Sequence, residues 1–116
     1  MIADFNLLLQ ETAKALQVDP ADILGPKRTK HASLARHVVM AIWADYHPFQ
    51  DAANRCNRGC HSTAMWARER VLNAAGLDKS FAFMVSEISR RCQYAPETVQ
   101  PECEQEEEAK YLEIKA

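Results

Sequence analysis

Amphipathic segments alternate with helix-ending residues along the first 94 positions of this chain. Within a segment, apolar residues recur three and four positions apart, which is the spacing of one face of an α-helix. Proline or glycine separates most of the segments, at Asp19-Pro20, Gly25-Pro26, His47-Pro48 and Gly76. The pattern predicts an all-α protein with short connections between its helices.

The expected helices cover residues 2–17, 20–24, 34–46, 49–56, 61–75 and 78–92. Asp19 and Ser33 have side chains suited to cap the second and third of them, and Gly76 suits the residue just beyond the fifth. The segment PKRTKHA, at residues 26–32, has too many charges and too little periodicity for a core helix. We therefore predict it to be a loop.

Length and composition fit one domain followed by a tail. With 116 residues, 47% of them hydrophobic, the chain can form a single core. We expect residues 1–94 to form one helical domain and the Glu-rich residues 95–116 to form a largely disordered tail, with a frayed helix over 105–115. No apolar run approaches the roughly 20 residues that span a bilayer, and the acidic start lacks the basic region of a signal peptide. These features predict a cytoplasmic protein without membrane contact, whose four cysteines stay reduced.

The net charge of −2 hides a strong asymmetry. Residues 27–70 hold eight Lys or Arg against three acids, together with all four histidines, whereas residues 1–26 carry −3 and residues 96–116 carry −5. A clustered basic block is the expected footprint of a phosphate-binding surface, although a solvated charged face has the same composition. The charge pattern therefore favours a nucleic-acid partner without specifying it.

Residues 49–75 outline a helix-turn-helix: a short helix, the turn Asn57-Arg58-Gly59 and a longer helix. The motifs RHVVMA at residues 36–41 and RGCHSTAMWA at residues 58–67 connect this outline with a family. Together they resemble the C-terminal DNA-binding domain of the bacterial replication initiator DnaA, a Trp-repressor-like helix-turn-helix. The resemblance covers about residues 19–75, with a helix-turn-helix core at about 33–75, and includes the basic loop KRTK at residues 27–30.

The resemblance implies that the helix beginning at His61 enters the major groove of duplex DNA. His61, Ser62 and Thr63 would then face base edges, because hydroxyls can donate or accept and the Thr methyl can pack on thymine. Arg28, and with it Lys30, would reach the adjacent minor groove, where arginine senses groove shape. The side chains expected to contact phosphate or to lie in the groove are Lys27, Lys30, Arg55, Arg58, Trp66, Arg68 and Arg70.

The function that follows is sequence-specific binding of double-stranded DNA without catalysis, in a small, nucleoid-associated transcription regulator or a modulator of DNA replication. No G-x-x-x-x-G-K-[ST] loop is present, so no ATP-driven activity or cofactor is expected. Nor does the sequence contain a nucleophile–base pairing or paired carboxylates near a histidine.

Departures from the family pattern leave the target sequence open. Gly59-Cys60 replace the Arg-Asp before the histidine, so the base-reading carboxylate of the family is missing. His37 replaces a Gln, and Trp66 replaces a His. The fold and DNA binding are expected to transfer to this chain, whereas the cognate DNA sequence is not.

Other interpretations stay open beside this one. The same fold can serve as a protein-interaction module that has lost specific DNA binding, which the missing carboxylate and the negative net charge favour. A homodimer through helix 78–92 would suit a palindromic site, whereas a monomer suits the DnaA resemblance. Zinc held by a cysteine and histidine set is the weakest alternative, because the C-x3-C-H spacing is not a usual finger pattern. That set is Cys56, Cys60 and His61 with Cys92 or Cys103.

Several side chains have a plain structural interpretation. Trp43 and Tyr46 are expected in the core, and Cys56 is expected to be a small buried thiol. Trp66 fits either the core or the groove. Cys60, at a helix N-terminus, is a candidate for a lowered thiol pKa and for redox sensitivity.

Overall fold

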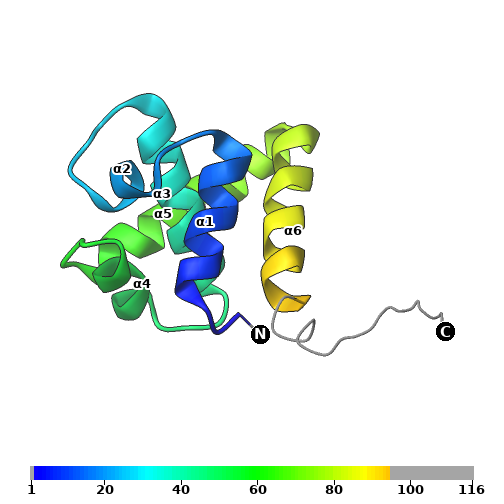
Figure 1. Cartoon of the computed structure of the whole chain (residues 1–116). Coiled ribbons are helices and arrows are strands. Elements are labelled where there is room, and N and C mark those ends of the chain that lie inside the picture. Colours follow the sequence, from blue (N-terminus) through cyan, green and yellow to red (C-terminus); the bar gives the residue numbers. More distant parts are fainter. Residues whose placement is uncertain (1, 95–116) are drawn as a thin grey trace, which may run out of the picture.

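A computed structural model of the chain describes residues 2–94, and within that range its regular structure is entirely helical. The helices are α1 (Phe5–Leu16), α2 (Pro20–Leu24), α3 (Lys30–Ala44), α4 (Phe49–Arg55), α5 (His61–Leu77) and α6 (Lys79–Tyr94). Figure 1 shows α1 and α6 side by side in front of α3 and α5, with α2 and α4 on the opposite flank from α6. The prediction of an all-α protein is confirmed.

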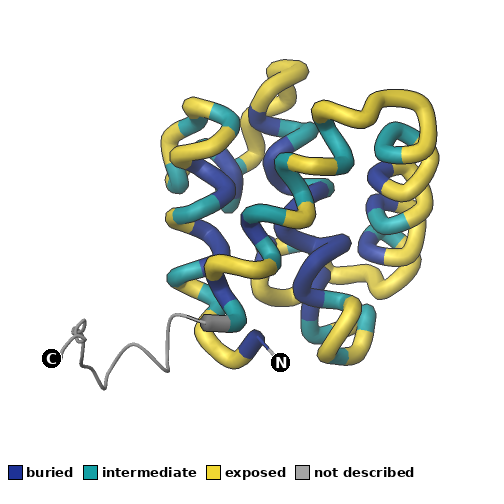
Figure 2. The backbone as a smooth tube through the Cα atoms, turned by 90° about the vertical axis from the view of Figure 1, so that its right-hand side faces the viewer, coloured by how far each residue is buried: buried dark blue, intermediate teal, exposed yellow. Residues whose placement is uncertain are grey.

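Helix α3 is the centre of the molecule and contacts each of the other helices. Every residue from Val38 to Trp43 is buried, so this part of α3 is covered on all sides rather than along one stripe. Burying a Val, Ile or Met side chain contributes about 1.5–3 kcal/mol each, which makes α3 the main source of core stability. Figure 2 shows the resulting arrangement, with buried positions on the inward sides of the helices and exposed positions outside.

The start of α3 differs from the prediction. The helix begins at Lys30 rather than near residue 34, because the Oγ1 of Thr29 accepts a hydrogen bond from the backbone N–H of Ala32 at 3.3 Å. Thr29 is therefore the N-cap, and Ser33 lies inside the helix. Only the first part of the segment 26–32 is a loop, and Lys30 stands in the first helical turn.

The end of α5 also differs from the prediction. The helix continues through Gly76 to Leu77, and Gly76 does not adopt the left-handed conformation of a C′ glycine. Asp78 separates α5 from α6 instead. Its Oδ1 accepts hydrogen bonds from the backbone N–H groups of Ser80 at 2.9 Å and Phe81 at 3.2 Å, which caps α6.

The aromatic residues at the end of α3 divide between core and surface. Trp43 is buried as expected: its ring stacks on His47 at 3.8 Å, and its Nε1 donates to Oδ2 of Asp51 at 2.6 Å. Tyr46 is exposed, so its expected place in the core was wrong. The reason is that α3 ends at Ala44, and Tyr46 leaves the helical face to accept a hydrogen bond from Nε2 of Gln93 at 2.8 Å.

In the part of the chain that the structure describes, no helix combines the length and the apolarity needed to cross a bilayer. The predicted acidic tail at residues 95–116, its frayed helix and Cys103 lie outside the described residues.

Candidate nucleic-acid interface

The turn between α4 and α5 is closed by a left-handed asparagine. Asn57 has φ 59°, and its backbone N–H donates to the carbonyl oxygen of Asn54 at 3.0 Å. The next N–H, that of Arg58, donates to the carbonyl oxygen of Ala53 at 2.8 Å. This pair of bonds is a Schellman motif, in which asparagine takes the place usually filled by glycine. Gly59 has no positive φ, so it is not the residue that turns the chain.

The backbone carbonyl groups of the loop between α2 and α3 accept hydrogen bonds from side chains of α3 and of the α4–α5 turn. Arg36, on α3 and only 5% exposed, donates to the carbonyl oxygens of residues 22, 23, 25 and 27 at 2.7–3.1 Å. Arg58 donates to the carbonyl oxygen of Gly25 at 3.0 Å, and Nδ2 of Asn57 donates to that of Leu24 at 3.0 Å. The loop and the α4–α5 turn are thus bound to one another. This role of Arg36 could not be predicted from the sequence, in which the residue is only the first position of the motif RHVVMA.

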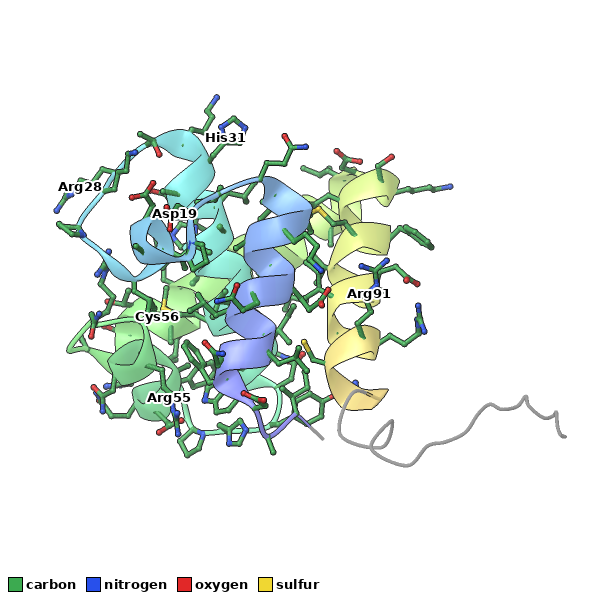
Figure 3. All side chains as sticks on the ribbon, viewed as in Figure 1. Asp19, Arg28, His31, Arg55, Cys56 and Arg91 are labelled. Atoms are coloured by element: carbon green, nitrogen blue, oxygen red, sulfur yellow. The ribbon has the colours of Figure 1, made fainter. Side chains whose placement is uncertain are left out.

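Three of the predicted cations line two neighbouring hollows: Lys30 and Arg70 line one, and Arg28 lines the other. Both Arg28 and Lys30 are exposed, and their side chains form no hydrogen bond or ion pair with the rest of residues 2–94. Figure 3 shows Arg28 at the outer edge of the loop, pointing away from the helices. Arg70, on α5, has its guanidinium carbon 4.6 Å from the centre of the Trp66 ring. We call Arg28, Lys30 and Arg70 the basic face.

Two hollows connect these cations. One, of about 470 Å³, is lined by Pro26, Arg28, Ser33, Arg36 and Arg58. The other, of about 230 Å³, lies between α3 and α5 and is lined by Lys30, Ser33, Leu34, His37, Arg70, Val71 and Ala74. Ser33 lines both, so the two hollows are neighbours on α3, one on the side of the α2–α3 loop and the other on the side of α5.

The first turn of α5 presents the predicted base-reading residues. His61 and Ser62 are exposed, and Thr63 is half-buried. Since consecutive helical residues are about 100° apart, these side chains spread around the helix end rather than sharing one stripe. The N-cap, Cys60, makes no side-chain cap bond to the helix. The backbone N–H of Thr63 donates to the carbonyl oxygen of Cys60 at 3.0 Å, and the positive end of the helix dipole at this terminus favours an anion.

Trp66 lies on the surface and not in the core, with 53% of its area exposed. The ring of His37 approaches it edge-on, with centroids 5.5 Å apart, while Arg70 lies over its face. Burial lowers the pKa of His37, and the nearby charges of Arg70 and Arg36 lower it further. A neutral His37 beside Trp66 leaves Arg70 as the charge at this end of the basic face.

Other predicted phosphate contacts lie elsewhere or are already bound. Arg55 lies against Phe5 and Trp43 and pairs with Asp51 at 3.4 Å. Figure 3 shows Arg55 at the opposite end of this flank from Arg28. Arg68 pairs with Asp45 at 3.1 Å. Lys27 pairs with Asp22 at 3.2 Å, and the Arg58 guanidinium is occupied by backbone carbonyls.

One exposed acid was overlooked in the sequence. Glu69 lies on α5 between Trp66 and Asn73, on the side farthest from the buried Ala64, Ala67 and Val71. Glu69 is exposed, so it adds a negative charge to the outer surface of α5. Glu69 is the only acid in α5 and follows Trp66 by three residues. This helical spacing would have predicted from the sequence that the two side chains are neighbours on the surface of α5.

The cysteines differ sharply in environment. Cys56 is fully buried, as expected, and burial raises the pKa of its thiol to about 12. Cys60 is exposed, and its Sγ lies 2.8 Å from Oγ of Ser62. The hydrogen bond with this hydroxyl lowers the pKa of the Cys60 thiol, and backbone N–H groups of the first turn add to the effect. Within residues 2–94, no three His, Cys, Asp or Glu side chains come together as a metal site.

Neither protein-family models nor curated protein sequences give a match to this chain.

Proposed function

We propose that the chain binds double-stranded DNA through α5 and the basic face, without catalysing a reaction. In this arrangement the first turn of α5 enters the major groove, and Arg28 on the α2–α3 loop reaches the adjacent minor groove. The role would be that of a small transcriptional regulator or of a modulator of replication. The observation that carries the proposal is that Arg28, Lys30 and Arg70 line two neighbouring hollows, one of them bordered by Arg58 of the turn before α5 and the other by α5 itself.

The charges support an extended anion better than a small one. The cations line two hollows that meet at Ser33 rather than converging on one point. A duplex carries a negative charge about every 1.7 Å along its axis, so separate cations can each engage a different phosphate. The hydroxyls and the imidazole at residues 61–63 then provide groups able to discriminate bases.

The test is selection of bound duplexes from a random DNA library, followed by titration of the selected duplex and a scrambled one. We expect a recovered motif, and its symmetry distinguishes a monomer from a dimer. Thr63→Ala or His61→Ala is expected to reduce the preference for the motif over the scrambled duplex. Arg28→Ala is expected to weaken binding, with any loss of preference confined to the A·T-rich positions beside the motif.

Lys14→Ala is the matched control, because Lys14 is an exposed cation on α1 that pairs with Glu11. It removes one positive charge without touching the basic face and should leave both affinities unchanged. If no motif emerges, and both duplexes bind weakly and alike, specific DNA binding is rejected.

A second candidate is a protein-interaction module on the same fold. It is favoured by four exposed apolar side chains of α5: Met65 is 46% exposed, Trp66 53%, Leu72 55% and Leu77 91%. Glu69 on the same helix opposes close approach of phosphate. This function would be supported if Leu72→Ser abolished capture of a protein partner while duplex binding stayed at the level of scrambled DNA.

A further inference from the structure

Arg36 is a buried cation without a carboxylate partner among residues 2–94. It is only 5% exposed, and all four of its hydrogen bonds go to backbone carbonyl oxygens. Burying a charge is costly, and an apolar side chain of similar volume would fill the same place at a lower cost. Packing alone therefore does not account for an arginine at this position.

The Arg36 guanidinium donates hydrogen bonds to several carbonyl groups within one short stretch of backbone, residues 22–27. Nε binds the carbonyl oxygen of Ile23 at 2.7 Å, while Nη2 lies 3.1 Å from that of Asp22, 3.0 Å from that of Gly25 and 2.9 Å from that of Lys27. These residues end α2 and lead into the loop. A planar fork with several donors can hold carbonyls that point in different directions, which a lysine ammonium does less well.

The residue that follows this stretch is Arg28, the outermost member of the basic face. The carbonyl before it is bound by Arg36, and the residue after it, Thr29, is fixed as the N-cap of α3. The backbone of Arg28 is therefore anchored on both sides, although its side chain is exposed.

The same stretch is also joined to the α4–α5 turn. Gly25 accepts hydrogen bonds from both Arg36 and Arg58, each at 3.0 Å, and Asn57 donates to Leu24 at 3.0 Å. The start of α5 follows directly from this turn. The loop is consequently joined by hydrogen bonds both to α3 and to the turn that leads into α5.

We propose that Arg36 is a positioning residue, which sets the place of Arg28 relative to α5 and so fixes the spacing between two contacts in neighbouring DNA grooves. It does not touch DNA itself. The inference rests on the proposed DNA binding, and it assigns Arg36 and Arg58 to holding the interface rather than to contacting phosphate.

The test is a double-mutant cycle on the full chain, using Arg36→Lys, Arg28→Ala and the double variant with the selected duplex. If Arg36 acts through Arg28, each single variant should lose affinity, by about ten-fold at most. In the Arg28→Ala background, Arg36→Lys should then cost less than about two-fold. Equal fold-losses in both backgrounds would overturn the proposal, because a general loss of stability is independent of Arg28. The matched control is Arg91→Lys, an exposed and paired arginine on α6, which should change nothing.

A second readout needs no DNA. Backbone NMR order parameters for residues 27 and 28 should match those of the helices in the unaltered protein and fall in Arg36→Lys, while those of α6 stay constant. If these residues are already mobile in the unaltered protein, the positioning role is rejected. If no duplex is bound but the order parameters behave as expected, the proposal of DNA binding fails, whereas the conclusion that Arg36 holds the loop in place is kept. If Arg36→Lys fails to fold, Arg58→Lys takes its place in both measurements. That variant weakens the other hydrogen bond to the Gly25 carbonyl and leaves the buried Arg36 intact.

Discussion

The salt dependence of duplex binding can be worked out from which cations are available. The logarithm of the binding constant falls with the logarithm of salt concentration by about 0.9 for each phosphate neutralised. The basic face supplies Arg28, Lys30 and Arg70, and Lys27 can join them because its pair with Asp22 is on the surface. Three to four contacts give a slope of about −2.7 to −3.6, or roughly a 40- to 150-fold loss of affinity between 50 and 200 mM salt.

The alternative is that every cation predicted from the sequence binds phosphate. Seven contacts, including Arg55, Arg58 and Arg68, would give a slope of about −6.3 and a loss of about 6,000-fold over the same range. Fluorescence anisotropy of a labelled duplex at several salt concentrations separates the two cases. Arg28→Ala should reduce the slope by about 1, and Arg55→Ala, the matched control, should leave it unchanged. A slope steeper than about −5, or an equal effect of both variants, would refute the assignment of the face.

Further predictions concern the tail, the core and the thiols. Deleting residues 96–116, which carry −5, should raise duplex affinity at low salt and have little effect at high salt if the segment competes for the basic face; unchanged low-salt affinity would remove that idea. Val38→Ala should lower the free energy of unfolding by about 2 kcal/mol, since Val38 is fully buried, while Leu72→Ala should cost under about 0.5 kcal/mol; denaturant titration measures both. In native protein at pH 8 with Cys103→Ser, a thiol reagent should modify Cys60 well before Cys56, whose thiol pKa is raised to about 12, and equal rates would contradict the burial of Cys56.

Helix positions could be predicted because the residues that begin and end helices act through local backbone geometry. Asp19 with Pro20, and Pro48 before α4, set helix starts through backbone geometry that needs no distant partner. The errors arose where two local signals competed. Thr29 and Ser33 are both suitable caps, and which one begins α3 depends on how the preceding loop is held by Arg36.

The candidate site was harder to predict because it depends on contacts between distant parts of the chain. The basic loop and the start of α5 were both identified from the sequence, but their attachment through Arg36 and Arg58 involves separations of 9 to 33 residues. Ion pairing was equally hidden: Arg68 meets Asp45 across 23 residues. A count of basic residues treats a paired arginine such as Arg68 in the same way as an unpaired one such as Arg28. Only the fold distinguishes the two.

The contrast between the two tryptophans gives the protein a pair of built-in optical probes. Trp43 is 1% exposed and stacked on His47, and Trp66 is 53% exposed beneath Arg70. Indole emission moves to longer wavelength in water, so the two rings emit at different ends of one spectrum. We expect a molecule that binds at α5 to alter mainly the long-wavelength component, and unfolding of the core to alter the short-wavelength component. Occupancy and unfolding can therefore be followed separately in unlabelled protein.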